Sequence, residues 1–462
     1  MLNKYFNYFF SIKSALILLS LYAISIALAT FIENDYGTIA ARALIFNSWW
    51  MELIHIFLCV IFIYNIFQYR LYHVNKIPVL FLHLSFIFII IGAGITRYIS
   101  EEGVMRIREG SLNNQFISSN QFLEFKMHNG SQQYSGQKEL LLSSLTNNNF
   151  SIPVKFNNQN ITIDYIDFIH DPINELIIDE STDGKELLEL IIPSSSGGMQ
   201  SEYVFKYENK EIQGLDVGFN IKDTVDLNIH QEDSLFYFSS KHDVEFMRMS
   251  NQSKGVLLKH IKHPFSNKTL YTILGKNLVF KNYFTDADLI KKSSSIKNDD
   301  AKLDLLKVKL SVLDQDTIID LYGSRGVVAS KEYFEFANLF FSFSYGSRIR
   351  SLPFAIFLKD FQLERYPGSD SPSSFASEIQ VLDGDKKFDY RIFMNNVLNH
   401  RGYRFFQSSY DQDEKGTILS VNKDKFGTGV TYFGYLSLLL SVLSVMISRY
   451  SRINILSRKN NV

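Results

Sequence analysis

Four stretches of this chain contain no Asp, Glu, Lys or Arg, and this absence of charge limits the folds open to it. They cover residues 14–32, 53–69, 77–96 and 426–448. Each is close to the roughly 20 apolar residues that an α-helix needs to cross the hydrocarbon of a bilayer. Between 97 and 425 charged residues are frequent and no comparable stretch occurs. The sequence therefore predicts a membrane protein with four transmembrane α-helices, three N-terminal and one C-terminal, and a large exported domain between the third and the fourth.

These stretches also set the expected boundaries along the chain. We expect an N-terminal membrane region at 1–98 with helices at about 14–32, 51–69 and 77–97, an exported domain at 99–425, a fourth helix at 426–448 and a basic tail at 449–462.

Basic residues near the ends of the apolar stretches predict their orientation, since Lys and Arg accumulate on the cytoplasmic side of a membrane. They lie before the first stretch, between the second and third, and after the fourth: Lys4, Lys13, Arg70, Lys76, Arg449, Arg452, Arg458 and Lys459. The segment at 33–52 has Arg42 as its one basic residue, beside acidic neighbours. We therefore expect cytoplasmic termini and a large domain on the outer face of the cytoplasmic membrane.

Charge and cysteine content restrict the function. The formal net charge is −1 at pH 7, so nothing favours a nucleic-acid partner. The only cysteine, Cys59, lies in the second apolar stretch, so the exported domain cannot form a disulfide. Any thiol chemistry in the pathway of this protein must come from other proteins.

The exported region alternates apolar and polar residues with the period of half-buried strands. The segments that show it are "NQFLEFKMH", "NITIDYIDFI", "LKVKLSVLD" and "KGTILSVNKD". Stretches rich in Ser, Asn, Gly and Pro separate them. We expect a β-rich, sandwich-like domain, with a boundary between two sub-domains near 290–302.

The exported region has no recognisable catalytic motif. It lacks the Gly-x-Ser-x-Gly, His-Glu-x-x-His, Walker and Gly-x-Gly-x-x-Gly patterns. His260 and His263 are three residues apart, but no cysteine lies near them and the carboxylates are scattered. A solvated surface pair is therefore favoured over a metal site.

One histidine, His83, lies deep in the third apolar stretch, roughly 5 Å to the cytoplasmic side of its middle at 1.5 Å per residue. A polar side chain at this depth either has a function or hydrogen-bonds a neighbouring helix. These two readings stay open on the residues alone. If the imidazole binds haem iron, the second ligand should come from another polypeptide, because His55 lies toward the opposite face of the membrane.

Several segments together resemble the ResB family of cytochrome c biogenesis proteins, also called CcsB, and in particular the N-terminal half of the Bacteroidetes-type CcsB–CcsA fusion. These segments are "FIENDYGT", "FNSWWMELI", "PVLFLHLSFIFIIIGAGITRYIS", "IREGS", "LPFAIFLKDFQLERYPGSDSPSSFASEIQV", "NHRGYRFFQSSYDQDEKGT" and "GTGVTYFGYLSLLLSVL". They extend over essentially the whole chain.

The resemblance implies a subunit of the system II machinery, which moves haem b outward and attaches it to apocytochrome c together with CcsA. His83 matches the family's axial haem ligand in the third span. Arg401 and Arg404 are candidates for contacts with haem propionates, with ordinary ion pairs as the alternative. The implied partners are CcsA, apocytochrome c and thiol-reducing thioredoxin-like proteins, and the implied location is the bacterial inner membrane with a periplasmic domain.

The chain departs from the fused version, because the tryptophan-rich segment and the outer histidines that belong to CcsA are absent. We therefore expect either a separate subunit or half of a split fusion, with no catalytic residues of its own. Two other roles remain as alternatives: a structural or chaperone subunit that organises CcsA and holds apocytochrome c without binding haem, and a membrane-anchored sensor or adhesin.

Overall fold

The computed structural model describes residues 9–178, 184–194, 197–222, 225–294 and 302–447. The chain divides into two compact units, one at Ile173–Lys292 and one formed by the residues on either side of it. The boundary expected near 290–302 falls largely on residues outside the described ranges, as do the tail at 449–462 and Lys4.

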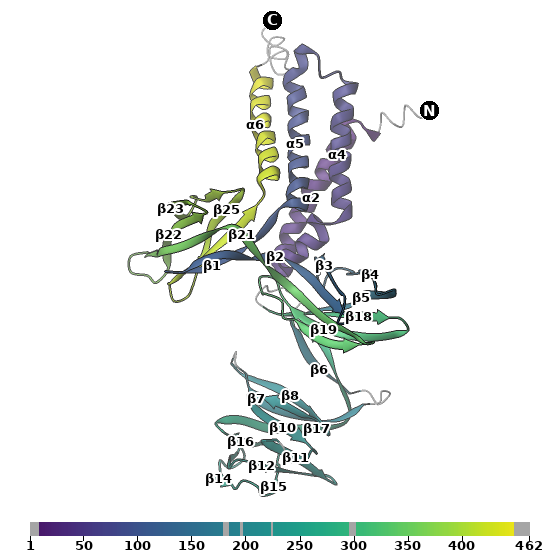
Figure 1. The fold of residues 1–462 in the computed structure, drawn as a ribbon, viewed down its shortest axis with the longest axis vertical. Helices are drawn as coiled ribbons and strands as arrows, with labels where there is room; N and C mark the ends of the chain where they lie inside the picture. Colours follow the sequence, from purple (N-terminus) through teal and green to yellow (C-terminus); the bar gives the residue numbers. More distant parts are fainter. Residues whose placement is uncertain (1–8, 179–183, 195–196, 223–224, 295–301, 448–462) are drawn as a thin grey trace. The chain divides into compact units, whose positions relative to one another are not determined.

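Within the described residues, four helices are long and apolar enough to cross a membrane. They are α2 (Ile12–Tyr36), α4 (Trp49–Gln68), α5 (Ile77–Ile99) and α6 (Lys425–Ile447). The shorter elements beside them are α3 (Thr38–Ala41), the π-helical turn η1 (Arg42–Phe46) and the 3₁₀ turn η2 (Val74–Lys76). Figure 1 shows the four long helices side by side, with large β-sheets in the chain between α5 and α6. The predicted fold class is confirmed.

Helices α5 and α6 pack closely because glycines face the neighbouring backbone. A Cβ added at Gly92 would lie 2.8 Å from the backbone nitrogen of Thr431, and one added at Gly434 would lie 3.2 Å from the carbonyl oxygen of Ser85. Small residues allow this approach in membrane helices, where van der Waals contact replaces the hydrophobic effect as the source of stability. The position of α6 against α5 therefore depends on these glycines.

The largest sheet of the first unit runs in the order β23-β22-β21-β2-β1-β26-β25-β24, with β3 paired to β2 and β20 paired to β21. Its strands are β1 (Glu101–Arg108), β2 (Leu112–His128), β3 (Gln133–Leu140), β20 (Glu332–Phe336), β21 (Leu339–Arg365), β22 (Pro372–Asp383), β23 (Lys386–Phe393), β24 (Leu398–His400), β25 (Tyr403–Tyr410) and β26 (Gly416–Lys423). Strand β1 follows α5 directly, and β26 directly precedes α6, so the two strands that adjoin the helices are neighbours in this sheet.

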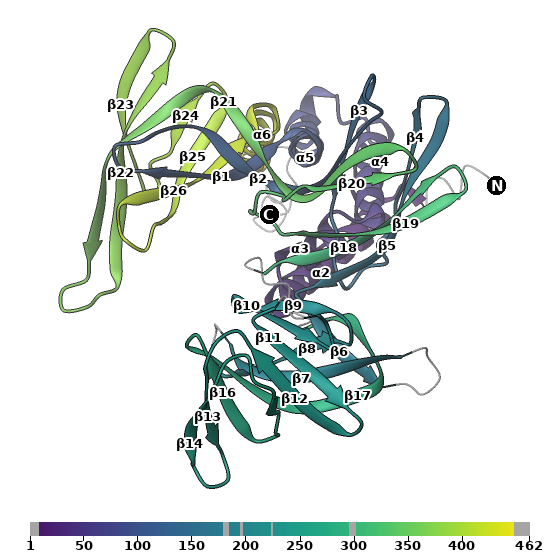
Figure 2. The ribbon, with the colours of Figure 1, turned by 60° about the horizontal axis from the view of Figure 1, so that its bottom comes forward.

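A smaller sheet packs on one half of the large one. It runs in the order β19-β18-β5-β4, and Figure 2 shows β18 between β5 and β19. Its strands are β4 (Ser151–Phe156), β5 (Gln159–His170), β18 (Asp304–Val312) and β19 (Gln315–Gly323). Alternate residues such as Ile161, Ile163 and Val308 are fully buried against Phe343 of β21. This is the sandwich packing that the alternating sequence pattern predicts.

The second unit is a sandwich with a separate core. One sheet runs β14-β13-β16-β17-β7-β8 with β6 paired to β17, and the other runs β15-β12-β11-β10-β9. The strands are β6 (Pro172–Ile178), β7 (Lys185–Pro193), β8 (Met199–Phe205), β9 (Asn209–Ile212), β10 (Leu215–Phe219), β11 (Leu227–Glu232), β12 (Leu235–Ser240), β13 (Val244–Arg248), β14 (Lys254–Leu257), β15 (His263–Pro264), β16 (Thr269–Ile273) and β17 (Lys276–Ser293). Residues of both sheets, including Leu190, Phe219 and Phe238, form one buried cluster.

Candidate functional site

His83 lies in the first half of α5, a helix that begins at Ile77 and has Pro78 in its first turn. Proline is tolerated there because the first N–H groups of a helix have no partner within the helix. Beyond this turn, a mostly apolar sequence continues the helix to Ile99, with Arg97 in its last turn. The local sequence therefore holds His83 on a regular helical backbone.

The imidazole of His83 is oriented by its own helix. Its Nδ1 lies 2.9 Å from the carbonyl oxygen of Val79, one turn earlier. Since a carbonyl can only accept, Nδ1 must carry the proton, and Nε2 then carries a lone pair. A hydrogen bond from the other ring nitrogen is the usual way in which a metal-binding histidine is fixed in its tautomer.

The surroundings of His83 are aromatic. The Phe62 ring of α4 meets the imidazole edge to face at a centroid distance of 5.8 Å, and it also stacks on Phe86 at 5.5 Å. Phe86 is one turn after His83 on α5 and its ring is partly exposed, whereas Phe62 is buried. An imidazole beside one buried and one partly exposed aromatic ring suits an apolar, planar ligand such as haem, for which one axial nitrogen is needed.

The structure also bears on the alternative role of His83, in which its imidazole would form a stabilising hydrogen bond with a neighbouring helix. Among the described residues, the hydrogen-bond partner of His83 is Val79 of the same helix, and its contact with α4 is the apolar ring of Phe62. The interhelical hydrogen bond that this alternative requires is therefore not formed within the part of the chain that the structure describes.

His55 lies in a different place from His83. Its ring meets that of Tyr22 of α2 at a centroid distance of 5.1 Å, and it lines a cavity of about 780 Å³ between the helices. Phe62, which contacts His83, is seven residues further along α4, so the two imidazoles are about 10 Å apart along the helix axis at 1.5 Å per residue. They are not placed to bind the same iron.

The two arginines proposed for propionate contacts both have partners. The Nε of Arg401 donates to Asp383 at 2.7 Å, and His400 shares the same carboxylate oxygen at 2.9 Å. The Nε of Arg404 donates to Asn399 at 3.1 Å, and its guanidinium lies over the ring of Phe406. The structure brings these side chains into β24 and β25 and the turn between them, and it does not bring them beside His83. Contacts with haem propionates remain a prediction.

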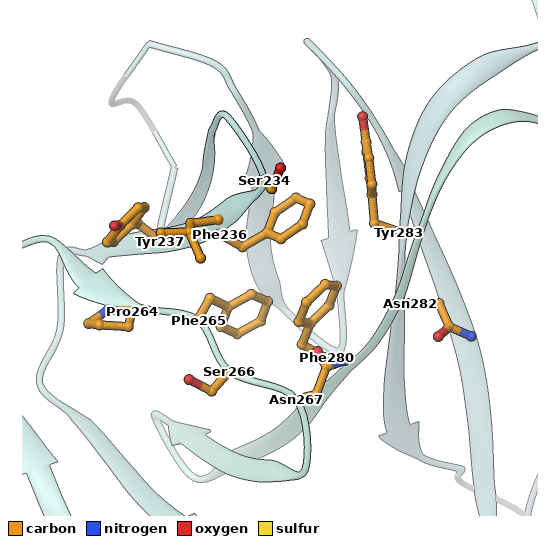
Figure 3. Close-up of a pocket in the computed structure, with 11 residues that line it drawn as sticks. Ser234, Phe236, Tyr237, Pro264, Phe265, Ser266, Asn267, Phe280, Asn282 and Tyr283 are labelled. Carbon is orange, nitrogen blue, oxygen red and sulfur yellow. The ribbon is translucent and has the colours of Figure 1, made fainter.

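The second unit has a cavity of about 520 Å³ at one end of its sandwich. Figure 3 shows the rings of Phe236, Phe265 and Phe280 gathered at its centre, with Tyr283 beside them. The side-chain hydroxyl of Tyr283 donates to Glu186, whose carboxylate also accepts from Lys206 at 2.6 Å. The cavity is an aromatic surface without a charged group at its centre.

Of the pair His260 and His263, the second has a hydrogen-bond partner in the backbone. The Nε2 of His263 bonds to the carbonyl oxygen of Leu258 at 2.9 Å. Within the residues that the structure describes, no group of three or more His, Cys, Asp or Glu side chains is arranged to bind a metal ion.

The sequence alone did not predict two features of the helices, the position of Arg42 in a cavity and the contact between Thr96 and Asp424. Arg42 lines the cavity beside His55, and its position as the one basic residue among acidic ones after the first apolar stretch was the available signal. Thr96 of α5 donates to Asp424 just before α6 at 2.6 Å. Nothing local in either segment indicates this contact, since the two residues are far apart in the sequence.

Comparison with known proteins supports the resemblance noted above. Residues 274–451 match the model of the ResB-like family. The chain is also 29% identical over 442 residues to the protein NrfI of Wolinella succinogenes, an alignment that covers 95% of this chain and 35% of NrfI. The chain thus spans about a third of the length of this relative. The similarity to ResB-like proteins that the sequence motifs indicate is confirmed over residues 274–451.

Proposed function

We propose that this chain is the haem-handling subunit of a system II cytochrome c synthase. It binds haem b in the membrane through His83, helps to export it, and supports its covalent attachment to apocytochrome c together with a CcsA-type partner. The similarity to ResB-like proteins and to NrfI supports a role in cytochrome c biogenesis. The observation that carries the haem assignment is the bond between Nδ1 of His83 and Val79, because it leaves Nε2 as the ligand atom.

The remaining parts of the proposal follow from charge and topology. Basic residues such as Lys13, Arg70 and Lys76 favour cytoplasmic placement of the ends of α2, α4 and α5 that lie away from the β-strands. The β-rich domain then lies in the periplasm, where apocytochrome c and thiol-reducing thioredoxin-like proteins act. The second axial ligand and the chemistry of attachment come from the CcsA-type partner.

The test is an absorption spectrum of the detergent-solubilised complex, co-expressed with its CcsA-type partner, for the wild type, His83→Ala and His83→Gly. We expect the Soret band to fall in both variants and to return when imidazole is added to His83→Gly. His73→Ala is the matched control, because His73 contacts Tyr72 just before η2, outside the span. An unchanged Soret band in both His83 variants would favour instead the structural subunit that organises CcsA and holds apocytochrome c.

A further inference from the structure

The cavity beside His55 lies at the end of the helices where the chain continues into β1. Ile56, Val60 and Ile90 contribute to its apolar wall. Its polar rim contains two guanidinium groups and three carboxylates, those of Arg42, Arg97, Glu52, Glu102 and Glu139. Its volume of about 780 Å³ and this division between apolar and polar groups are typical of a site for a small ligand. His83 does not line it.

The rim contains two arginines, and of these only Arg97 forms an ion pair or a side-chain hydrogen bond with the described residues. Arg97 pairs with Glu52 at 2.8 Å and donates to the carbonyl oxygen of Asn47 at 2.7 Å. Arg42 is half-buried, yet it forms neither an ion pair nor a side-chain hydrogen bond with any residue that the structure describes. The carboxylates that line the same cavity are bonded elsewhere: Glu52 to Arg97, Glu102 to Asn422 and Glu139 to Asn120. A partly desolvated cation that is not ion-paired is costly, so this arrangement favours an added anionic group beside Arg42.

The backbone at Arg42 is unusual as well. Arg42 begins the π-helical turn η1, in which Asn47 N–H bonds to the carbonyl oxygen of Arg42 at 2.7 Å. Turns of this kind occur mostly as single insertions in helices and frequently at functional sites. The turn follows α3 directly and contributes Arg42 and Phe46 to the cavity lining.

His55 is the second polar side chain of this cavity, after Arg42, that has no hydrogen-bond partner among the described residues. Its ring contacts Tyr22, but neither ring nitrogen forms a hydrogen bond with the described residues. The nearest carboxylate on the same helix, Glu52, is already bonded to Arg97 and to the hydroxyl of Tyr98. An imidazole without a hydrogen-bond partner, in the wall of a mostly apolar cavity, is suited to bind a metal centre.

We propose that this cavity is a second haem-binding station, on the β-strand side of His83, where His55 binds the iron and Arg42 pairs with a propionate. The inference rests on the proposed function, because it takes haem to be the molecule that the chain handles. The chemistry of the cavity fits an apolar, planar metal complex that carries carboxylates. An anionic lipid would also satisfy Arg42, but it would make no use of the His55 imidazole. His55 therefore separates the two ligands.

The test is a haemin titration of the purified full chain in detergent, followed by absorption and compared with a protein-free detergent blank. We expect two haemin molecules per chain in the wild type, one in His55→Gly and one in His83→Gly, with added imidazole restoring the lost site in each. Arg42→Gln should weaken the His55-dependent site by about ten-fold or more, as expected for one charge-assisted pair, whereas Arg42→Lys should weaken it less. Arg70→Gln, which removes an arginine outside the cavity, is the matched control.

Each other result has a distinct meaning. One haemin per chain that is lost only in His83→Gly would overturn the second station and leave the proposed function intact. Two haemin molecules retained in His83→Gly would instead remove the basis of the proposed function. The titration is repeated in nanodiscs of phosphatidylglycerol and of phosphatidylcholine. Loss of the His55-dependent site only in phosphatidylglycerol would identify the cavity as a lipid site and overturn the inference.

Discussion

Thr96 donates a hydrogen bond to the carboxylate of Asp424 at 2.6 Å, and this contact joins the third membrane helix to the start of the fourth. The other oxygen of the same carboxylate accepts from the backbone N–H of Gly427 at 3.0 Å, so Asp424 also caps α6. A buried acid therefore fixes both the end of the β-rich domain and the register of α6 against the helix that carries His83.

Replacing Asp424 should weaken this junction. We expect Asp424→Ala to destabilise the protein by about 2 kcal/mol, since it removes a helix cap and a buried charge-assisted hydrogen bond. Thermal unfolding in detergent measures the loss. Thr96→Ser keeps the hydroxyl and serves as control, whereas Thr96→Val should lose stability and add little to Asp424→Ala in the double variant. Full additivity of the two losses would show that the bond contributes nothing to stability.

The close approach of α5 and α6 makes a second prediction. Gly92→Ala places a methyl group within 2.8 Å of the Thr431 backbone, so we expect a loss of about 1–3 kcal/mol from overpacking. The wider separation of α5 from α6 should also alter the environment of His83 and shift the Soret band of the complex. Gly94→Ala is the matched control, because an added Cβ there meets nothing within 4 Å. Equal behaviour of the two variants would argue against close packing at Gly92.

The carboxylate of Glu186 predicts a pH dependence of stability in the second unit. Hydrogen bonds from Lys206 and Tyr283 lower the pKa of Glu186 below its usual value of 4.5. A lowered folded pKa adds stability above the unfolded pKa, and this stability disappears as the pH falls through the folded value. We expect Glu186→Gln to lower the unfolding midpoint at pH 7, and we expect this difference from the wild type to shrink as the pH falls through the folded pKa of Glu186. A difference that stays constant as the pH is lowered would contradict the linkage.

Tyr283 makes the opposite prediction at high pH. Burial, together with the bond to Glu186, raises the pKa of Tyr283 to about 12. A raised folded pKa stabilises the protein below the unfolded value of 10, and this contribution is lost as the pH rises toward 12. Between pH 9 and 11 the thermal unfolding midpoint of Tyr283→Phe should therefore fall less than that of the wild type. An equal fall of the midpoint in both proteins would show that ionisation of Tyr283 does not contribute to the alkaline loss of stability.

The pairing of Arg401 with Asp383 allows a test of the propionate prediction. If the arginine acts through the ion pair, Arg401→Gln and Asp383→Asn should each lower stability, and the double variant should lose little more than either one. Haem content should stay at the wild-type level in all three variants. A fall in haem content confined to Arg401→Gln would support a propionate contact.

The fold could be predicted from sequence where the signal is local. The absence of charge defines the four helices, and alternation in "NQFLEFKMH" and "LKVKLSVLD" marks parts of β2 and β18. Pairing between distant segments leaves no local signal. The strand β21 continues from Leu339 to Arg365 through both halves of the large sheet, and the pairing of β1 with β26 joins residues from the two ends of the β-rich region.

The candidate site shows the same division. A lone histidine in an apolar stretch is visible in the sequence, so His83 could be identified before its surroundings were known. Its tautomer depends on the carbonyl of Val79, and the cavity around His55 depends on a π-helical turn that packs on two other helices. Such relationships arise from three-dimensional packing, which residue spacing alone does not specify.

The pairing of β1 with β26 also has a mechanical consequence. The two strands leave the sheet toward α5 and α6 at the same end, with Glu101 opposite Lys423 as the first pair and Arg108 opposite Gly416 as the last. A lateral force that pulls the two helices apart would therefore break the hydrogen bonds of this ladder one pair at a time, starting from the pair nearest the helices. It would not load all the hydrogen bonds of the ladder at the same time, as a shearing force along the strands would. Within the ladder, resistance to such a force comes mainly from the first few pairs, and it adds to the packing of α5 against α6 and to the Thr96–Asp424 contact.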